Sequence, residues 1–233
     1  MKSDQFDSMP EAFADITLED LQKRQETWQR QLREQQRSGP PPLNLGQRAF
    51  ARSQFQLQIR ISKARKKGED AKTTYQKLLD DNLTAVALLQ GAAGTGKSVL
   101  LDAMQLQMQN YGLGIMVITA WTGVASAPFN QSTLCKLLKL DFAHLSKKKV
   151  MRDHQIDLMQ GDFKKHICDP ADLLVLVIDE VSFLVPEALH HIDIQLQRLR
   201  GVYDVPFGGV LIILAGDFWQ KIHQAVFPLL NNL

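Results

Sequence analysis

The sequence has little cysteine and no long apolar run. Its 233 residues include two cysteines, Cys135 and Cys168, and no Cys-x-x-Cys pair, so neither a disulfide framework nor a zinc site is predicted. The first twenty residues are acidic without an apolar core, and no stretch of about 18 apolar residues follows, which argues against secretion and membrane spanning. We therefore expect an intracellular protein in a reducing compartment.

A large excess of charge of one sign is also missing. The formal net charge is +2, which is too small to indicate a nucleic-acid partner by itself. Hydrophobic residues make up 45% of the chain and charged residues 22%, as in ordinary globular proteins. The length favours one large domain or one domain with an appendage.

Residues 1–42 are predicted to form an N-terminal extension with one helix and a proline-rich linker. In the helix, residues 17–37, Thr17 and Asp20 stand at the spacing of a capping box, and the apolar stripe is thin. A solvated helix is favoured over a partner-binding one. The helix ends at Ser-Gly-Pro-Pro-Pro, residues 38–42, because consecutive prolines cannot continue it.

Residues 43–82 are predicted to form a separate helical region. Phe55, Leu57, Ile59 and Ile61 alternate as in a strand, yet the many Ala, Gln and Arg residues and the absence of internal turn residues favour a helix. A basic cluster follows these alternating residues and comprises Lys63, Arg65, Lys66 and Lys67. We expect a solvated helix end there rather than a nucleic-acid contact or a nuclear-import signal.

From residue 83 to residue 233 the pattern indicates an α/β domain. Four apolar runs, residues 83–89, 114–119, 172–179 and 209–216, alternate with helix-like segments. Continuous apolar strands of this kind are typical of a parallel sheet with helices on both faces. Between the second and third runs, residues 141–170 are polar and are interpreted as an insertion or loop-rich crossover.

The first apolar run leads into Gly-Ala-Ala-Gly-Thr-Gly-Lys-Ser, which fits the phosphate-loop pattern G-x-x-x-x-G-K-[ST]. Glycines let the backbone wrap a phosphate chain, and the following helix N-terminus favours negative charge. Lys97 is expected to meet the β- and γ-phosphates and Ser98 to bind Mg²⁺. The predicted cofactor-binding loop comprises Gly91, Ala92, Ala93, Gly94, Thr95, Gly96, Lys97 and Ser98.

The other three apolar runs also end in polar groups. Asp179 and Glu180 follow the third run and fit a magnesium ligand and a group that polarises the attacking water, although Asp-Glu after a strand is often only a helix cap. Asp217 and Gln220 follow the fourth run, where Gln220 could contact the γ-phosphate or form part of a polar turn. The second run ends in Thr-Ala-Trp-Thr-Gly-Val-Ala-Ser, which fits a DNA contact or a plain helix start.

These stretches, in this order, resemble the Pif-type DNA helicases of superfamily one, and among them the helicase part of Helitron transposon proteins. The resemblance spans about residues 43–220, and the Gly-Gly, strand, Gly-Asp-x-x-Gln arrangement is its most specific motif. It implies a RecA-like P-loop NTPase fold, with ATP and Mg²⁺ as cofactors and single-stranded DNA as partner. It assigns adenine recognition to Gln47, catalysis to Lys97, Glu180 and Gln220, metal binding to Ser98 and Asp179, and DNA contact to Thr119, Trp121, Thr122, Gly123 and Thr133.

The chain departs from the family pattern at several positions. Trp121 and Cys135 replace other residue types in the DNA-contact stretches, and the sequence after Gln220 differs from the family. A second RecA-like domain, which the resemblance implies, is not recognised in this sequence. The main expectation is an ATP-dependent DNA helicase motor, in the nucleus rather than the mitochondrion. The alternatives are a truncated or transposon-derived remnant that binds nucleotide and DNA without unwinding, and an oligomeric ATPase that borrows Arg198 or Arg200 from a neighbour.

Overall fold

A computed structural model describes residues 43–92, 94–120, 133–140, 153–184 and 186–217. The predicted helix at 17–37, the proline-rich linker, Ala93, Trp121, Thr122, Gly123 and Gln220 lie outside these ranges. The chain divides into two compact units, Met1–Asn44 and Leu45–Leu233. All elements described below belong to the second unit.

The centre of this unit is a four-stranded parallel sheet. Its strands are β1 (Val86–Gln90), β2 (Ile115–Ala120), β3 (Leu173–Asp179) and β4 (Leu211–Gly216), in the spatial order β1-β4-β3-β2. All three neighbouring pairs are parallel. Each strand overlaps one of the four apolar runs, so the predicted α/β fold with a parallel sheet is confirmed. The sequence did not predict the strand order.

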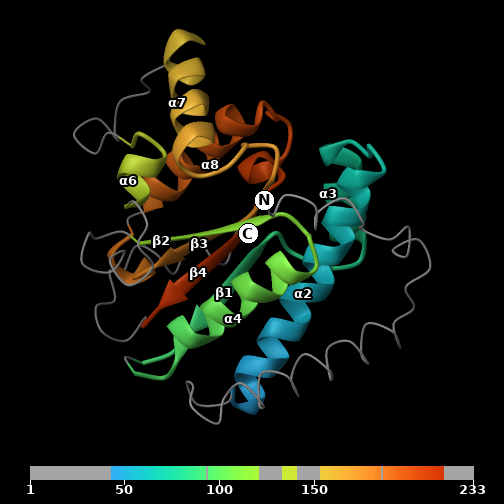
Figure 1. Cartoon of the computed structure of the whole chain (residues 1–233), viewed down its shortest axis with the longest axis vertical. Helices are drawn as coiled ribbons and strands as arrows, with labels where there is room; N and C mark the ends of the chain where they lie inside the picture. The colour runs from blue at the N-terminus through green and yellow to red at the C-terminus, as the bar shows by residue number, and fades with distance from the viewer. Residues whose placement is uncertain (1–42, 93, 121–132, 141–152, 185, 218–233) are drawn as a thin grey trace, which may run out of the picture. The chain divides into compact units, whose positions relative to one another are not determined.

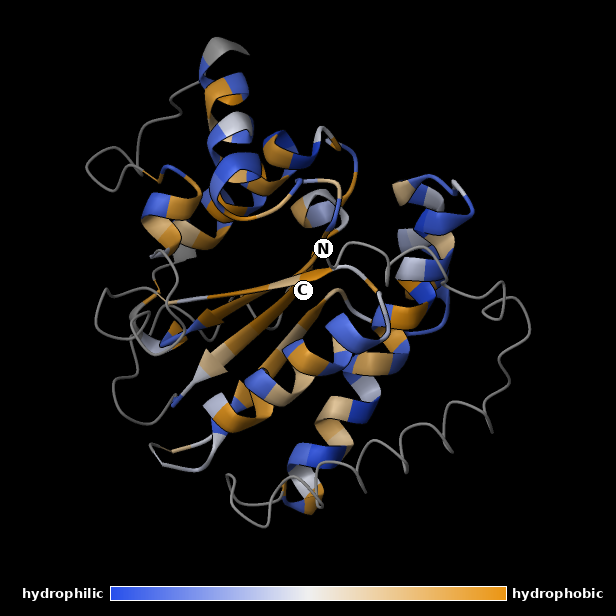
Figure 2. Cartoon of the chain, viewed as in Figure 1, coloured by the Kyte–Doolittle hydropathy of each residue, from blue (hydrophilic) through white to orange (hydrophobic). Residues whose placement is uncertain are grey.

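Helices cover both faces of the sheet (Figure 1). The helices α2 (Leu45–Lys66) and α4 (Lys97–Asn110) lie on one side, and α6 (Leu134–Leu137), α7 (Asp153–His166) and α8 (Pro186–Arg200) lie on the other. The helix α3 (Ala71–Asp80) follows α2, and two short 3₁₀ helices, η3 (Val181–Phe183) and η4 (Pro206–Gly209), flank α8. The strands are mostly apolar whereas the helices are striped (Figure 2), as expected for a sheet covered on both faces.

The core forms around the two central strands. Every residue of β4 is buried, and so is every residue of β3 except Asp179. On the side of α7 and α8, alternate strand residues pack against the apolar stripes of these helices, as the two-residue period of a strand requires. This layer contains Leu176, Ile178, Ile212, Leu214, Met159, Phe163, Ile192, Leu196 and Leu199.

Residues 45–66 form a helix, as predicted, but the interpretation of its basic end was wrong for Arg65. Arg65 is half-buried, and its guanidinium donates hydrogen bonds to the carbonyl oxygens of Leu173 (2.9 Å) and Gly209 (2.8 Å). These carbonyls lie at the amino ends of β3 and β4. The sequence could not show that α2 ends there, because the two strands are more than 100 residues away along the chain.

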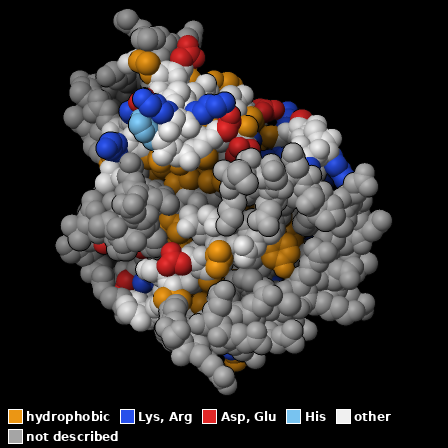
Figure 3. All heavy atoms as spheres, viewed as in Figure 1, with side chains coloured by type: hydrophobic (Ala, Val, Ile, Leu, Met, Phe, Trp, Pro, Cys, Tyr) orange, Lys and Arg blue, Asp and Glu red, His pale blue; other side chains and the backbone are white. Residues whose placement is uncertain are grey.

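The prediction of a loop-rich crossover at 141–170 was also wrong in part, since α7 spans Asp153–His166. Its apolar stripe is narrow: Met159 and Phe163 are buried, and Leu158 is exposed. A helix with one narrow stripe has an overall polar composition, which is why the segment resembled a loop. The last turn of α7 is basic, and Figure 3 shows basic side chains and a histidine on the upper part of the visible face.

Candidate active site

The strand order brings the predicted catalytic segments to one edge of the sheet. In the parallel register, Gln90 at the end of β1 is beside Gly216 at the end of β4, and Ala120 at the end of β2 is beside Asp179 at the end of β3. The strand β4 lies between β1 and β3. The phosphate loop after β1 and the Asp-Glu pair after β3 therefore flank the end of β4, at the carboxyl edge where ligands of parallel sheets bind.

The loop between β1 and α4 has the backbone of a phosphate-binding loop. Gly94 and Gly96 have positive φ angles of 76° and 81°, a region that glycine enters without steric cost. A Cβ atom at Gly91 would lie 2.6 Å from the Thr95 hydroxyl, so any other residue there would displace the Thr95 side chain. The helix α4 begins directly after Gly96, and its first N–H groups lack partners within the helix. Such an N-terminus favours a bound anion.

Lys97 folds back over this loop. Its ammonium group donates to the carbonyl oxygens of Gly91 (2.6 Å) and Ala92 (3.0 Å), while the Thr95 hydroxyl also donates to Ala92 (2.8 Å). Ser98 is the second residue of α4 and is exposed. The loop therefore carries the Lys97 ammonium group and the exposed Ser98 hydroxyl, the two side chains that the phosphate-loop pattern requires for phosphate and magnesium.

Gln47, in the first turn of α2, reaches the same loop. Its Nε2 atom donates to the carbonyl oxygens of Thr95 (3.0 Å) and Gly96 (3.2 Å). A Cβ atom at Gly96 would lie 3.0 Å from this amide nitrogen, so the glycine also permits the contact. The structure places Gln47 against the loop backbone; the adenine-recognition role stays a prediction.

Asp179 and Glu180 form a tight pair at the end of β3. The Glu180 N–H donates to Asp179 Oδ1 (2.8 Å), and Glu180 adopts a left-handed conformation with φ 55°, which few non-glycine residues do. Burial raises the pKa of Asp179; the Glu180 N–H and the positive charge of Lys97 oppose this rise, and the Glu180 charge adds to it. The influence of Lys97 shows that the phosphate loop and the Asp-Glu pair share one electrostatic environment.

Gly216, the first residue of the Gly-Asp-x-x-Gln motif, joins these two parts, a role that the motif alone does not reveal. Its carbonyl accepts a hydrogen bond from the Gly91 N–H (3.1 Å). A Cβ atom at Gly216 would lie 3.1 Å from the Val181 backbone nitrogen and 3.2 Å from Val181 Cγ1. The residue after it, Asp217, is half-buried at the same edge. The signal in the sequence was the pair of small residues, Ala215 and Gly216, at the end of an otherwise bulky strand.

The predicted DNA-contact residues are described only in part. Thr119, next to the end of β2, is buried in the sheet. Thr133 caps α6, its hydroxyl accepting from the Lys136 N–H (3.5 Å). Their roles in DNA binding stay predictions. Within the described ranges, no three His, Cys, Asp or Glu side chains group as metal ligands, and no helix is long and apolar enough to cross a bilayer.

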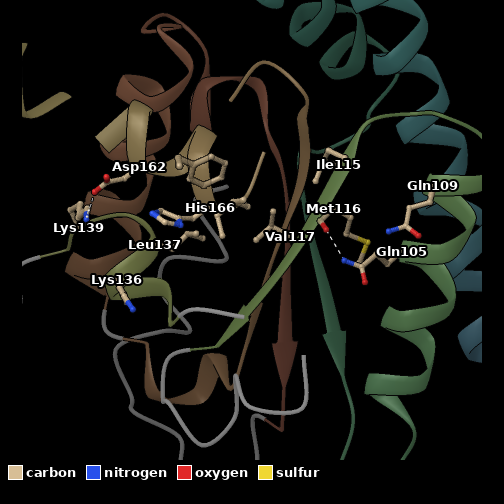
Figure 4. Close-up of a pocket in the computed structure, with 12 residues that line it drawn as sticks. Gln105, Gln109, Ile115, Met116, Val117, Lys136, Leu137, Lys139, Asp162 and His166 are labelled. Carbon is tan, nitrogen blue, oxygen red and sulfur yellow. Dashed lines mark hydrogen bonds and ion pairs between the residues drawn. The ribbon is translucent and has the colours of Figure 1, made fainter. Parts of the chain in front are cut away.

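A cavity of about 640 Å³ lies elsewhere, beside the amino half of the edge strand β2 (Figure 4). It lies between α4 and the α6–α7 side, and Gln105 from α4 donates to the Met116 carbonyl of β2 (2.9 Å) along its wall. None of the predicted nucleotide, metal or DNA residues lines it. The cavity is therefore separate from the carboxyl-edge site.

Comparison with known proteins identifies the family. The sequence pattern of the PIF1-like helicases matches residues 68–226, more than half of the chain. The chain belongs to the PIF1-like helicase family. This confirms the predicted resemblance to Pif-type helicases, whereas the relation to Helitron transposon proteins stays a prediction.

Individual PIF1-like relatives agree with this assignment. The ATP-dependent DNA helicase PIF1 of Trypanosoma brucei brucei is 40% identical over 132 residues, which cover 56% of this chain and 12% of the relative. The ATP-dependent DNA helicase RRM3 of Saccharomyces cerevisiae is 34% identical over 134 residues, covering 56% and 17%. This chain thus spans less than a fifth of either relative's length. A solved structure of Bacteroides sp. Pif1 in complex with ADP-AlF4 has a TM-score of 0.46 and 24% identity, covering 70% of this chain and 36% of that one.

Proposed function

We propose that this chain is the ATP-hydrolysing motor part of a DNA helicase. The single observation that carries the proposal is the convergence of Lys97, Asp179 and Glu180 at one sheet edge, next to a loop with a phosphate-binding backbone. Family membership adds the type of reaction, because the two relatives described above are named ATP-dependent DNA helicases.

The residues present fit ATP and Mg²⁺. The left-handed glycines and the start of α4 suit a phosphate chain, and Lys97 supplies a positive charge beside it. Magnesium usually takes one or two carboxylates together with substrate phosphates and water, so Ser98 and Asp179 form a sufficient protein ligand set. When bound, the metal would neutralise charge on the phosphates. Gln47 would hold the loop in shape, and its proposed contact with adenine would add base selectivity.

Glu180 has the proposed role of accepting a proton from the attacking water. Glu180 follows Asp179 in a left-handed backbone conformation, and in the proposed division of roles Asp179 serves the metal and Glu180 the water. Gln220 would report the state of the γ-phosphate. This division of roles matches hydrolysis in which positioning and charge stabilisation do most of the catalytic work.

Single-stranded DNA is the proposed partner, bound beyond the end of β2. Thr119 and Thr133 bracket the segment that carries Trp121, Thr122 and Gly123. Hydroxyls and small residues suit a phosphodiester backbone, and an aromatic side chain can stack on a base. A DNA-acting motor of this type would work in the nucleus, and unwinding would require a second RecA-like domain.

Nucleotide binding can be tested with the purified chain. We expect a fluorescent ATP analogue with Mg²⁺ to bind, and Lys97→Ala to weaken binding at least about tenfold, since a charge-assisted hydrogen bond contributes about 1.5–3 kcal/mol. Lys67→Ala is the matched control, because Lys67 is an exposed lysine away from the loop. Absence of nucleotide binding in the unsubstituted chain would refute the proposal.

DNA coupling needs a second measurement. We expect single-stranded oligothymidylate to bind and to stimulate ATP hydrolysis, and Glu180→Gln to abolish hydrolysis while ATP still binds. Nucleotide and DNA binding without stimulated hydrolysis would instead support the alternative of a binding remnant.

A further inference from the structure

A second cavity, of about 390 Å³, lies at the opposite, amino-terminal edge of the sheet. It is lined by the last turns of α2, by α3 and by the segments that precede β1, β3 and β4, with apolar walls that include Ile61, Tyr75, Leu78 and Leu211. Gln47 and Arg65, at the two ends of α2, are about 27 Å apart along the helix. The cavity is thus remote from the phosphate loop.

Two arginines, Arg65 and Arg200, line this cavity and use their N–H groups on main-chain carbonyls alone. Arg65 donates to Leu173 and Gly209, and Nη1 of Arg200 donates to the loop carbonyls of Pro170 and Ala171. Neither arginine forms an ion pair with a carboxylate of the described residues. Two positive charges therefore meet neutral acceptors in this cavity, whose lining also includes Glu69, a carboxylate that is already paired with Lys77 (2.9 Å).

The electrostatics of this pair favour an anion. Burial and, to a smaller extent, the charge of Arg200 lower the pKa of Arg65 to about 9, and Asp172 opposes this change. Burial also lowers the pKa of Arg200, against the carboxylates of Asp172 and Asp169. Asp169 is already paired with Lys164 (2.6 Å). Because arginine stays protonated in proteins, both side chains keep their charge, and the net lowering of their pKa values means that the nearby carboxylates do not fully offset the cost of burial.

Arg200 also has an unused hydrogen-bonding edge. Its Nε atom is buried without a hydrogen-bond partner among the described residues, and its hydrogen bonds to Pro170 and Ala171 both come from Nη1. In a guanidinium group, the Nε–H and the neighbouring Nη2–H point the same way and match two oxygens of a carboxylate or phosphate. Arg200 lines the cavity, so ligand binding through this edge would require its side chain to turn and to exchange its Nη1 bonds for bonds to the ligand.

We propose that this cavity binds a small ligand that joins an oxyanion, a carboxylate or a phosphate, to an apolar body. Arg200 and Arg65 hold the oxyanion, and the walls around Tyr75 and Leu78 enclose the apolar part. The volume lies within the range of about 300–1,000 Å³ typical of small-molecule sites. The site does not depend on ATP binding or DNA unwinding.

The test follows the Nε–H signal of Arg200 in nitrogen-15 NMR spectra of the full chain, assigned by its loss in Arg200→Lys. The probes are benzoate, phenyl phosphate and benzamide, which share one ring and differ in the attached group. We expect benzoate or phenyl phosphate to shift the signal with a Kd of about 1 mM, as suits a ligand of this size. The anion that binds more tightly shows whether the site prefers a carboxylate or a phosphate. The neutral benzamide should bind at least about tenfold more weakly, because it supplies no negative charge to pair with the two arginines.

Two variants complete the test, with binding followed through neighbouring backbone signals. Arg200→Lys keeps the charge but loses the two-pronged edge, and it should lower affinity at least about tenfold, whereas Arg198→Lys on the same helix should not. Ala71→Leu narrows the cavity at the first residue of α3 without altering either arginine, and it should also reduce binding. The proposal fails if neither anion shifts the signal below about 20 mM, if benzamide binds as tightly as the anions, or if Arg198→Lys and Arg200→Lys have equal effects. ATP binding is measured in parallel, so failure here is distinguishable from failure of the proposed motor function.

Discussion

Substitution of Gln47 by alanine tests whether α2 supports the phosphate loop independently of the nucleotide base. The Gln47 amide donates to the carbonyls of Thr95 and Gly96, the residues in which the loop turns into α4. Without these bonds the loop is free to sample other conformations, and a ligand must then restrict them on binding. We expect Gln47→Ala to weaken the binding of any phosphate chain, including one without a base.

The magnitude follows from the exposure of the two bonds. The bond to Thr95 is exposed and the bond to Gly96 is part-buried, so each should contribute at the low end of the range for a protein hydrogen bond, about 0.5 kcal/mol. Together they amount to about 1 kcal/mol, which corresponds to roughly a fivefold loss of affinity.

The assay is competition of magnesium tripolyphosphate against a fluorescent ATP analogue, in the unsubstituted chain, Gln47→Ala and Gln56→Ala. Gln56 is an exposed glutamine on the same helix and serves as the matched control. An unchanged tripolyphosphate affinity in Gln47→Ala, or an equal loss in Gln56→Ala, would refute the reasoning. A further loss specific to ATP would measure the proposed adenine contact.

Three other predictions concern the same sheet. Asp179→Asn should raise the free energy of unfolding of the ligand-free chain at neutral pH, because the raised pKa of Asp179 means that its ionised form is less stable in the native state than in the unfolded state. Urea unfolding at several pH values should show this gain shrinking as the pH falls through the raised pKa. The same substitution should remove Mg²⁺ affinity. Gly216→Ala should cost about 1–3 kcal/mol in urea unfolding and slow ATP hydrolysis, because its Cβ would crowd Val181 beside the Asp-Glu pair; retention of full activity would contradict this. Leu176→Ala, at a fully buried site, should lower the unfolding free energy by about 2–5 kcal/mol, against less than about 0.5 kcal/mol for exposed Leu45→Ala.

Much of the motor architecture could be predicted because its signals are local. The four apolar runs correspond to the four strands, since short runs of this kind that alternate with helical segments are typical of a sheet covered on both faces. The phosphate loop was recognisable from Gly91 to Ser98 because its glycine backbone, lysine and hydroxyl are adjacent in the chain. Asp179 and Glu180 were identified in the same way, by their place directly after a strand.

The failures occurred where a residue's environment comes from distant parts of the chain. Arg65 was interpreted as part of a solvated basic helix end, yet it donates hydrogen bonds to main-chain carbonyls at the amino ends of β3 and β4. The helix α7 was interpreted as part of a loop, because its sequence is mostly polar. Its few buried apolar residues show a helical pattern only once the core that they contact is known. Gly216 was recognised as part of the Gly-Asp-x-x-Gln motif, but its contacts with Gly91 and Val181 could not be predicted, because these residues come from other parts of the chain.

The sequence by itself thus determined the type of fold, the phosphate loop and the acidic pair, because each depends on neighbouring residues and short-range periodicity. Only the tertiary structure decided that β4 lies between β1 and β3, that Gln47 supports the loop, and that Arg65 and Arg200 meet in one cavity. These arrangements join residues up to 144 positions apart, such as Arg65 and Gly209, and no local pattern encodes such pairs. They are set by how the strands and helices pack together to bury their apolar surfaces.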